Sequence, residues 1–389
     1  MQLRPNFASL LATVALLPSV LAVGTPFGLG SATTGGGSAA AATPTSLSQL
    51  TTWLSDSTAR TIVLDRLWDF TGIEGTTTGS GCKPWTCSPN PQIAIDKDSW
   101  CENFQPNAAK TTVTYDNAGL NPLRVGNNKT LLGKGSGSGI QGKGLYLNRS
   151  NNVIIQNIKI VNINPQFVWG GDAIAVHNMK MIDGGSNIWI DHNFIQNIGR
   201  QFIATGYGAV SKTTISNNVF DGDTTWSPNC NGQAYWAFIF TGAGDQLTFA
   251  LNHVYHTSGR GPHVGGTSGF FQNVHVFNNY YDHIDGHAIE PDVGSKILLE
   301  GNYFNTVTSP DLAGDGQLYV PTSSSTACQS ALGRSCVANT LNGSGALVDA
   351  SDTGVLNGIT AAYSAGATVM SAQDAANYVQ SHAGVGIVN

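Results

Sequence analysis

Six stretches of the chain repeat one pattern of apolar and polar positions. Each begins with β-branched or aromatic residues, passes through a polar position, usually Asn, and returns to an aromatic or aliphatic residue. The stretches are 152–160, 187–195, 213–221, 248–256, 274–282 and 296–304. Alignment on Asn193, Asn218, His253, Asn279 and Asn302 gives spacings of 25, 35, 26 and 23 residues. Self-similarity at about 20 to 50 residues predicts a solenoid, and repeats made only of strands predict a β-helix.

The polar column of this repeat predicts a ladder along the solenoid. Asn tolerates left-handed bends, and its amide can bond to the same group one coil away. We therefore interpret these asparagines as structural rather than catalytic. An all-β sandwich is the alternative fold, but the uneven spacing and the scarcity of tight hairpin signals count against it.

Two short helices are expected near the ends of this all-β body. In the sequence SLSQLTTWLSD, residues 46–56, Leu47, Leu50 and Leu54 fall on one helical face. Near the C-terminus, Ser371 and Asp374 have capping-box spacing, and Gly384 provides a stop. We expect both helices to cap the solenoid and protect its exposed sheet edges.

Composition supports one large β-rich body and narrows the range of partners. Only 11% of the 389 residues are charged, 47 are Gly, and the net charge is −6. We expect residues 23–389 to form a single domain and to act as a monomer. No basic run is present, which argues against nucleic acid as a partner. A mildly acidic surface also disfavours a strongly polyanionic substrate unless a cation bridges the two.

The first 22 residues have the pattern of a secretory signal peptide. Arg4 supplies the positive end, 7–17 form the apolar segment, and small or apolar residues precede a cut after Ala22. A membrane anchor is the alternative, but the apolar segment is too short for one. No later apolar run reaches about 18 residues, so we expect a secreted protein without a membrane partner.

Export makes the cysteines candidates for disulfides, and three sequons are candidates for glycosylation. The six cysteines are Cys82, Cys87, Cys101, Cys230, Cys328 and Cys336. Cys328 and Cys336 are close in sequence and are expected to pair locally, which leaves Cys230 to pair with one of the first three. No zinc motif is present. The sequons begin at Asn128, Asn148 and Asn342.

Three polar residues lie at rigid or glycine-rich positions and could carry chemistry. Asp172 follows two glycines and precedes an apolar strand, Arg200 follows a strand closely, and Arg260 lies in the sequence HTSGRGP. Gly259 and Gly261 are expected to leave room for a ligand beside Arg260. The alternatives are a buried Asp that satisfies turn amides and two solvated surface arginines. In a chain so poor in arginine, the three together are the stronger candidate site.

Aromatic residues in loops are candidates for sugar binding. Aromatic rings that line a cleft suit the apolar faces of sugar rings, although core packing is the alternative. The candidates are Trp85, Trp100, Trp169, Tyr235 and Trp236.

From about residue 24 to the C-terminus, the chain resembles the fungal pectin lyases of polysaccharide lyase family 1. Eight separated stretches carry the resemblance in order: TTGGGSA, WDFTGIEGTTTGSGC, IAIDKDSWCENF, INPQFVWGGDAI, IWIDH, IGRQ, YWAF and HTSGRGP. The resemblance implies a right-handed, single-stranded parallel β-helix that cleaves methyl-esterified polygalacturonate, or pectin, by β-elimination. It implies the pairs Cys82–Cys101, Cys87–Cys230 and Cys328–Cys336, and it maps the catalytic positions onto Asp172, Arg200 and Arg260.

The resemblance also implies that no metal cofactor is needed. The related pectate lyases hold calcium with several carboxylates, and Arg200 stands at one of those carboxylate positions. They also tend to carry a second arginine where this chain has Gly265. A calcium-dependent pectate lyase remains an alternative function.

The chain departs from the family pattern at several positions. The stretch 177–187 looks longer than the family's turn, Ile239 and Thr241 stand where Tyr and Asp are frequent, and His263, a candidate substrate contact, stands where Lys is frequent.

Two further functions compete with elimination. A polygalacturonase would need two carboxylates, and Asp221 with Asp223 is the nearby pair. A non-catalytic sugar-binding β-helix would not need Asp172, Arg200 and Arg260 together.

Overall fold

The structure is a computed structural model that describes residues 24–176, 183–321 and 325–388. The predicted signal peptide, residues 1–22, lies outside the described residues. So does most of the long stretch 177–187, of which 183–187 belong to a strand.

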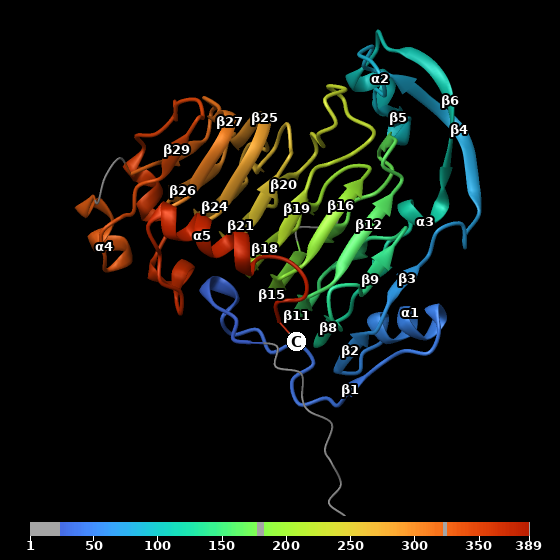
Figure 1. The fold of residues 1–389 in the computed structure, drawn as a ribbon, viewed down its shortest axis with the longest axis horizontal. Helices are drawn as coiled ribbons and strands as arrows, with labels where there is room; N and C mark the ends of the chain where they lie inside the picture. Colours follow the sequence, from blue (N-terminus) through green and yellow to red (C-terminus); the bar gives the residue numbers. More distant parts are fainter. Residues whose placement is uncertain (1–23, 177–182, 322–324, 389) are drawn as a thin grey trace, which may run out of the picture.

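The strands form a parallel β-helix, which excludes the sandwich (Figure 1). One face is a ten-stranded parallel sheet of β1 (Ala41–Ala42), β2 (Arg60–Leu64), β8 (Lys129–Gly133), β11 (Asn151–Gln156), β15 (Asp183–Asp191), β18 (Ala209–Ser216), β21 (Gly244–Ala250), β24 (Phe271–Phe277), β26 (Ser295–Glu300) and β28 (Gln317–Tyr319). Each coil then continues into a second sheet, which has two parts, called wings here. β25 (Tyr280–Pro291) pairs with strands of both wings and so joins them into one sheet.

The two wings form the other faces of the solenoid. The first wing contains β3 (Leu67–Asp69), β9 (Gly139–Gln141), β12 (Lys159–Ile163), β16 (Phe194–Ile198), β19 (Val219–Asp221), β22 (His253–Tyr255), β27 (Tyr303–Asp311) and β29 (Thr340–Asn342). The second wing, called the cleft face below, contains β7 (Leu123–Arg124), β10 (Leu145–Tyr146), β14 (Ile174–Val176), β17 (Ile203–Thr205), β20 (Phe238–Phe240) and β23 (His263–Val264).

A small lobe projects beside the cleft face. Its sheet contains β4 (Thr76–Lys83), β5 (Ile93–Ile95), β6 (Ala109–Asp116) and β13 (Phe167–Val168). The short β13 leaves the solenoid just before Trp169 and pairs with β5, so the lobe is joined to the loop that carries Asp172.

The repeated sequence pattern is two strands and a sharp bend, not one strand. At each bend a residue with positive φ precedes the polar column; these residues are His192, Asn217, Leu251, Asn278 and Gly301. The next residue turns its amide into the solenoid, so the left-handed residue and the ladder residue are neighbours rather than the same residue.

The ladder itself is confirmed, with one correction. Buried amides bond in series from Asn193 through Asn218, Asn252 and Asn279 to Asn302, at 2.9–3.0 Å. The alignment on His253 was wrong by one residue, because Asn252 occupies the ladder and His253 faces Asp282 outside. The ladder continues to Asn339, at 3.0 Å.

Apolar and aromatic side chains fill the interior of the solenoid. Phe220 and Phe238 have ring centroids 4.6 Å apart, and Phe238 and Phe249 have centroids 5.1 Å apart; all three are fully buried. These rings lie in coils that support Arg200 and Arg260, so the core beneath the cleft is tightly packed.

The two predicted helices are present, but only one lies at an end of the solenoid. Helix α1 (Leu47–Ser55) buries Leu50 and Leu54 beside the first coils. Helix α5 (Ala372–His382) begins with the Ser371–Asp374 capping contact but packs on the outside of the first wing, against Tyr280. The expected cap at the C-terminal edge was therefore wrong, because the apolar face of α5 covers strand side chains.

The other helices are short. They are α2 (Trp100–Phe104), α3 (Asn117–Leu120), α4 (Gln329–Leu332), and the 3₁₀ turns η1 (Gly28–Gly30), η2 (Lys97–Ser99), η3 (Thr326–Cys328), η4 (Thr353–Asn357) and η5 (Ala361–Ser364). Within the described residues, no helix is long and apolar enough to cross a membrane.

The disulfides agree with the pairing that the resemblance implied. They join Cys82 to Cys101, Cys87 to Cys230, and Cys328 to Cys336. The second bond ties the small lobe to the loop before Tyr235. Of the sequons, Asn128 and Asn342 are exposed and Asn148 is partly buried; their glycosylation stays a prediction.

Candidate active site

The outward row of the cleft face forms a floor that is uncharged in its middle. The strand register aligns Tyr146 with Ala175, Ala175 with Ala204, Ala204 with Ile239, and Ile239 with His263. Small and apolar side chains therefore occupy the middle of this row, whereas Arg124 follows Tyr146 at one end and Glu290 follows His263 at the other.

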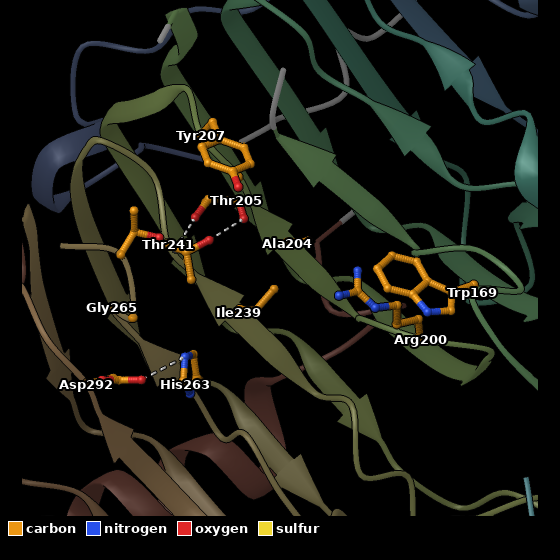
Figure 2. A pocket seen from close by; sticks show the side chains of 13 residues that line it. Trp169, Arg200, Ala204, Thr205, Tyr207, Ile239, Thr241, His263, Gly265 and Asp292 are labelled. Carbon is orange, nitrogen blue, oxygen red and sulfur yellow. Dashed lines mark hydrogen bonds and ion pairs between the residues drawn. The ribbon is translucent and has the colours of Figure 1, made fainter. Parts of the chain in front are cut away.

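Two cavities lie end to end over this floor. One has a volume of about 330 Å³ and includes Ile239, Thr241 and His263; the other has a volume of about 420 Å³ and includes Asp172. Both are lined by Trp169 and Arg200, so the two cavities form one groove with these residues at its middle. Figure 2 shows Arg200 stacked on Trp169 at one side of the first cavity and His263 with Asp292 at another.

Asp172 enters the groove at the start of β14, after a tight backbone turn. Its Oδ1 accepts the backbone N–H of Gln201 at 2.9 Å, and its Oδ2 lies 3.8 Å from Arg200 Nη1. A side chain on Gly171 would collide with the carbonyl of Gly119, and its φ is +133°. Asp172 thus satisfies a turn amide and also faces an arginine, which combines the two roles considered for it.

Arg200 is a partly buried cation with aromatic and anionic neighbours. Its guanidinium carbon lies 3.9 Å from the centroid of the Trp169 ring, a cation–π contact. Burial lowers the pKa of Arg200, the charge of Asp172 raises it, and the charge of Arg260 lowers it. The two arginines are therefore close enough to repel one another.

Arg260 is held rigidly through its backbone while its guanidinium stays unpaired. Its φ is +54°, its N–H donates to His287 Nε2 at 3.1 Å, and its carbonyl accepts the N–H of Phe238 at 2.8 Å. The guanidinium lies 4.8 Å from the Trp236 ring centroid, and its buried Nε has no hydrogen-bond partner among the described residues. Burial lowers the pKa of Arg260, whereas Glu290 and Tyr235 raise it.

The glycines beside Arg260 serve the protein's own packing. A Cβ on Gly259 would lie 2.6 Å from the Tyr235 ring, and one on Gly261 would lie 3.3 Å from Ala288. The expectation that they leave room for a ligand was wrong, because these side-chain and backbone atoms already occupy the space.

The predicted aromatic residues gather on both sides of the arginines. Trp169 lines both cavities, and its ring centroid lies 6.4 Å from that of Trp100. The ring centroids of Trp85 and Tyr235 lie 6.2 and 4.9 Å from that of Trp236. Each is half-buried against the small lobe or the groove. Trp169 both packs against the lobe and lines the groove, whereas the other four aromatic residues line neither cavity, and their role in sugar binding stays a prediction.

A buried glutamine that the sequence did not single out links the two arginine sites. Gln92 Oε1 accepts from Trp236 Nε1 at 2.9 Å, and its Nε2 donates to the carbonyl of Gly199 at 2.7 Å. It therefore connects the ring beneath Arg260 to the backbone beside Arg200.

Other groove residues were also missed by sequence reasoning. They are Lys97, Tyr146, Thr205, Tyr207 and Asp292. The strand register places Tyr146 in the floor row, and a correct alignment of the coils would have found it. Tyr207 and Asp292 lie on loops, where the repeat gives no positional signal.

The carboxylates are too dispersed for the paired arrangements considered. Asp172 lines one cavity and Asp292 the other, while Asp221 ends β19 on the first wing and lines neither. Among the residues that the structure describes, no three His, Cys, Asp or Glu side chains gather into a group that could hold a metal ion.

Comparisons with known proteins agree with this geometry. The sequence profile described as "Pectate lyase" matches residues 101–388. A probable pectin lyase F-1 from Aspergillus terreus is 45% identical over 362 residues, covering 90% of this chain and 91% of the relative. Pectin lyase B from Emericella nidulans is 42% identical over 361 residues, covering 92% and 93%.

Solved structures share the fold at lower sequence identity. A pectate lyase from Bacillus sp. N165 in complex with trigalacturonate superposes with a TM-score of 0.56 at 19% identity, covering 94% of this chain and 100% of the other. The cedar pollen allergen jun a 1 gives a TM-score of 0.57 at 18% identity, with 92% of each chain covered. The likeness supports the right-handed parallel β-helix.

Proposed function

Because this chain belongs to the pectate lyase family and is a polysaccharide lyase, we propose that it cleaves α-1,4-linked, methyl-esterified galacturonan by β-elimination without a metal ion. The relatives at 42–45% identity carry the name pectin lyase. The observation that carries the proposal is the pair of partly buried arginines, each against a tryptophan, beside the uncharged middle of the floor.

The chemistry needs a base, charge stabilisation and a leaving group. The C5 proton of one sugar moves to the base, and its electron pair forms the C4=C5 double bond. The C4–O bond breaks, its electrons leave with the glycosidic oxygen, and that oxygen takes up a proton from water. Negative charge develops on the ester carbonyl beside C5 along the way.

Arg260 is the proposed base. An arginine is ordinarily always protonated, but burial lowers the pKa of this one, and no carboxylate in the described structure pairs with its guanidinium. Its backbone is fixed by the bond to His287, and Trp236 supports the guanidinium from one side. Arg260 lines neither cavity itself, but its charge acts on Arg200 at the middle of the groove.

Arg200 and Asp172 complete the site. A donor aimed at the ester carbonyl lowers the barrier as negative charge develops there. Arg200 has that role, and Asp172, 3.8 Å away, orients it. A methyl ester carries no charge, so the floor of Ala175, Ala204 and Ile239 accepts it without desolvating an ion.

The competing functions have weaker support. Hydrolysis normally uses two paired carboxylates, and the groove's two acids line different cavities. Calcium-dependent binding would need clustered oxygen ligands, whereas Arg200 places a fixed cation beside Asp172. A purely sugar-binding role does not account for an unpaired buried guanidinium.

Three related expectations remain part of the proposal. Residues 23–389 act as a single catalytic domain and as a monomer on the pectin polymer, without nucleic acid or membrane as partner. The protein is secreted, which fits its three disulfides.

The type of bond cleavage is the direct test of this function. Incubation with highly methyl-esterified pectin should produce oligosaccharides that absorb ultraviolet light through a C4=C5 double bond, each lighter by one water than a hydrolysis product. Ultraviolet absorbance and mass spectrometry of the products measure both properties. Saturated products of full hydrolytic mass would identify a hydrolase instead, and absence of any cleavage would leave only sugar binding.

A further inference from the structure

The cavity of about 330 Å³, called the first cavity here, carries opposite charges on its two sides. Its charged or titratable lining residues are Arg200, Tyr207, His263 and Asp292. Figure 2 shows Asp292 and His263 across the cavity from the stacked pair of Arg200 and Trp169. Asp292 is therefore the one carboxylate among the described residues that line this cavity, and it lies on the side away from Arg200.

The turn that follows β25 fixes the direction of the Asp292 carboxylate. The backbone N–H of Asp292 donates to the carbonyl of Val264 at 2.8 Å, which ties the residue to β23 on the cleft face. Its Oδ1 accepts the backbone N–H of Val293 at 2.6 Å, and the side chain is 40% exposed. Because Oδ1 is held by its own turn, Oδ2 is the oxygen left for a ligand in the cavity.

This oxygen is open to the cavity and has no close cation beside it. Gly266, which also lines the cavity, has a φ of +107°, and a Cβ there would lie 3.2 Å from Asp292 Oδ2. His263 Nε2 is 3.9 Å away, beyond hydrogen-bond distance, while its Nδ1 lies closer to Glu290 Oε2, at 3.0 Å. Among the described residues, no Lys or Arg lies within ion-pair distance of Asp292. This side of the cavity therefore presents an exposed negative charge.

Every sugar of a galacturonan brings a carboxyl group, either as a free carboxylate or as a neutral methyl ester. In the first cavity a free carboxylate would meet the like charge of Asp292, whereas an ester would not. We propose that Asp292 is a specificity-determining residue, whose charge disfavours unesterified galacturonate in the first cavity and so selects a methyl ester there. The uncharged floor tolerates an ester, and Asp292 adds a penalty against the acid. The inference rests on the proposed function for the identity of the polymer.

The kinetic test compares highly with sparsely methyl-esterified pectin. Asp292→Asn removes the charge but keeps an oxygen for the N–H of Val293. We expect the ratio of kcat/KM for the two pectins to fall at least about threefold, through faster cleavage of the sparsely esterified one. The matched control is Asp65→Asn, since Asp65 is 37% exposed and lines neither cavity, and it should leave the ratio unchanged.

Two results of this comparison would overturn the proposal. One is an unchanged ratio in Asp292→Asn. The other is an equal loss of kcat/KM on both pectins, which would mean that Asp292 binds sugar hydroxyl groups instead of repelling carboxylates.

A second variant separates charge from side-chain shape. Asp292→Glu keeps the negative charge, so its ratio should stay within about twofold of wild type. Salt screens exposed charges, so added salt should lower the ratio more in wild type than in Asp292→Asn. A Glu variant with the ratio of the Asn variant would contradict the proposal, as would equal salt dependence of wild type and Asp292→Asn.

A binding readout keeps the inference separate from the proposed function. Calorimetry with Arg260→Lys and Arg260→Lys/Asp292→Asn measures Kd while cleavage is slow. The second variant should bind an unesterified oligogalacturonate at least about threefold more tightly, and its methyl ester within about twofold of the first. Equal affinities of the two variants for the unesterified oligomer would overturn the proposal. If wild-type protein yields no unsaturated product, the proposed function fails and this binding comparison alone decides the inference.

Discussion

Replacement of Arg260 by Lys should reduce kcat on methyl-esterified pectin by at least about 10²–10³-fold, the usual loss for one well-placed catalytic group, while KM changes less. Lys keeps a positive charge, but its ammonium group reaches less far than the Arg guanidinium and is not planar. It cannot keep the same position against Trp236 while reaching a sugar C5 proton. Steady-state kinetics at saturating pectin measure the effect.

A matched control separates catalysis from loss of a stacked arginine. Arg66 lies over Trp68 at 4.0 Å in an exposed position on the first coils, far from the groove in sequence and fold. Arg66→Lys should retain wild-type kcat and a similar unfolding temperature. A folded Arg260→Lys enzyme with near-wild-type turnover would make Arg260 a loop anchor.

Replacement of Asn252 by Leu should destabilise the solenoid strongly, although the two side chains are similar in volume. Asn252 accepts the backbone N–H of Asn218 at 3.1 Å and its amide at 2.9 Å, and donates to Ile215 and Asn279 at 3.0 Å. Each buried group left without a partner costs about 1–3 kcal/mol. We expect the free energy of unfolding to fall by at least about 3 kcal/mol, measured by guanidinium unfolding.

The neighbouring residue provides the control for the register. His253 is partly exposed; its ring lies 3.5 Å from a carboxylate oxygen of Asp282 and beside the rings of Tyr255 and Tyr280, without a place in the ladder. His253→Ala should cost about 1 kcal/mol or less. Equal losses for the two variants would contradict the ladder as the source of stability.

The periodic features of this molecule could be predicted from the sequence, down to the parallel solenoid and its asparagine ladder. The error at His253 arose because the sequence repeats unevenly there: Asn252 and His253 are both polar, and only the bend at Leu251, with φ +60°, decides which one points inward. A leucine gives no sequence signal for a left-handed residue.

The site could be predicted only where local sequence carries it. Asp172, Arg200 and Arg260 stand at distinctive turns, and the structure brings the first two within 3.8 Å. Gln92, more than 100 residues before Trp236 in the chain, contacts it through a lobe that no repeat predicts. The position of α5 could not be predicted, because it depends on which outward strand face the assembled coils leave exposed.

The most direct test of the proposed function compares two polymers by ultraviolet absorbance, with and without a chelator. The account predicts faster formation of unsaturated product from highly methyl-esterified pectin than from polygalacturonate, with a rate that EDTA leaves unchanged. Faster cleavage of the acidic polymer, or loss of activity on chelation with recovery on adding calcium, would contradict it and identify a calcium-dependent pectate lyase.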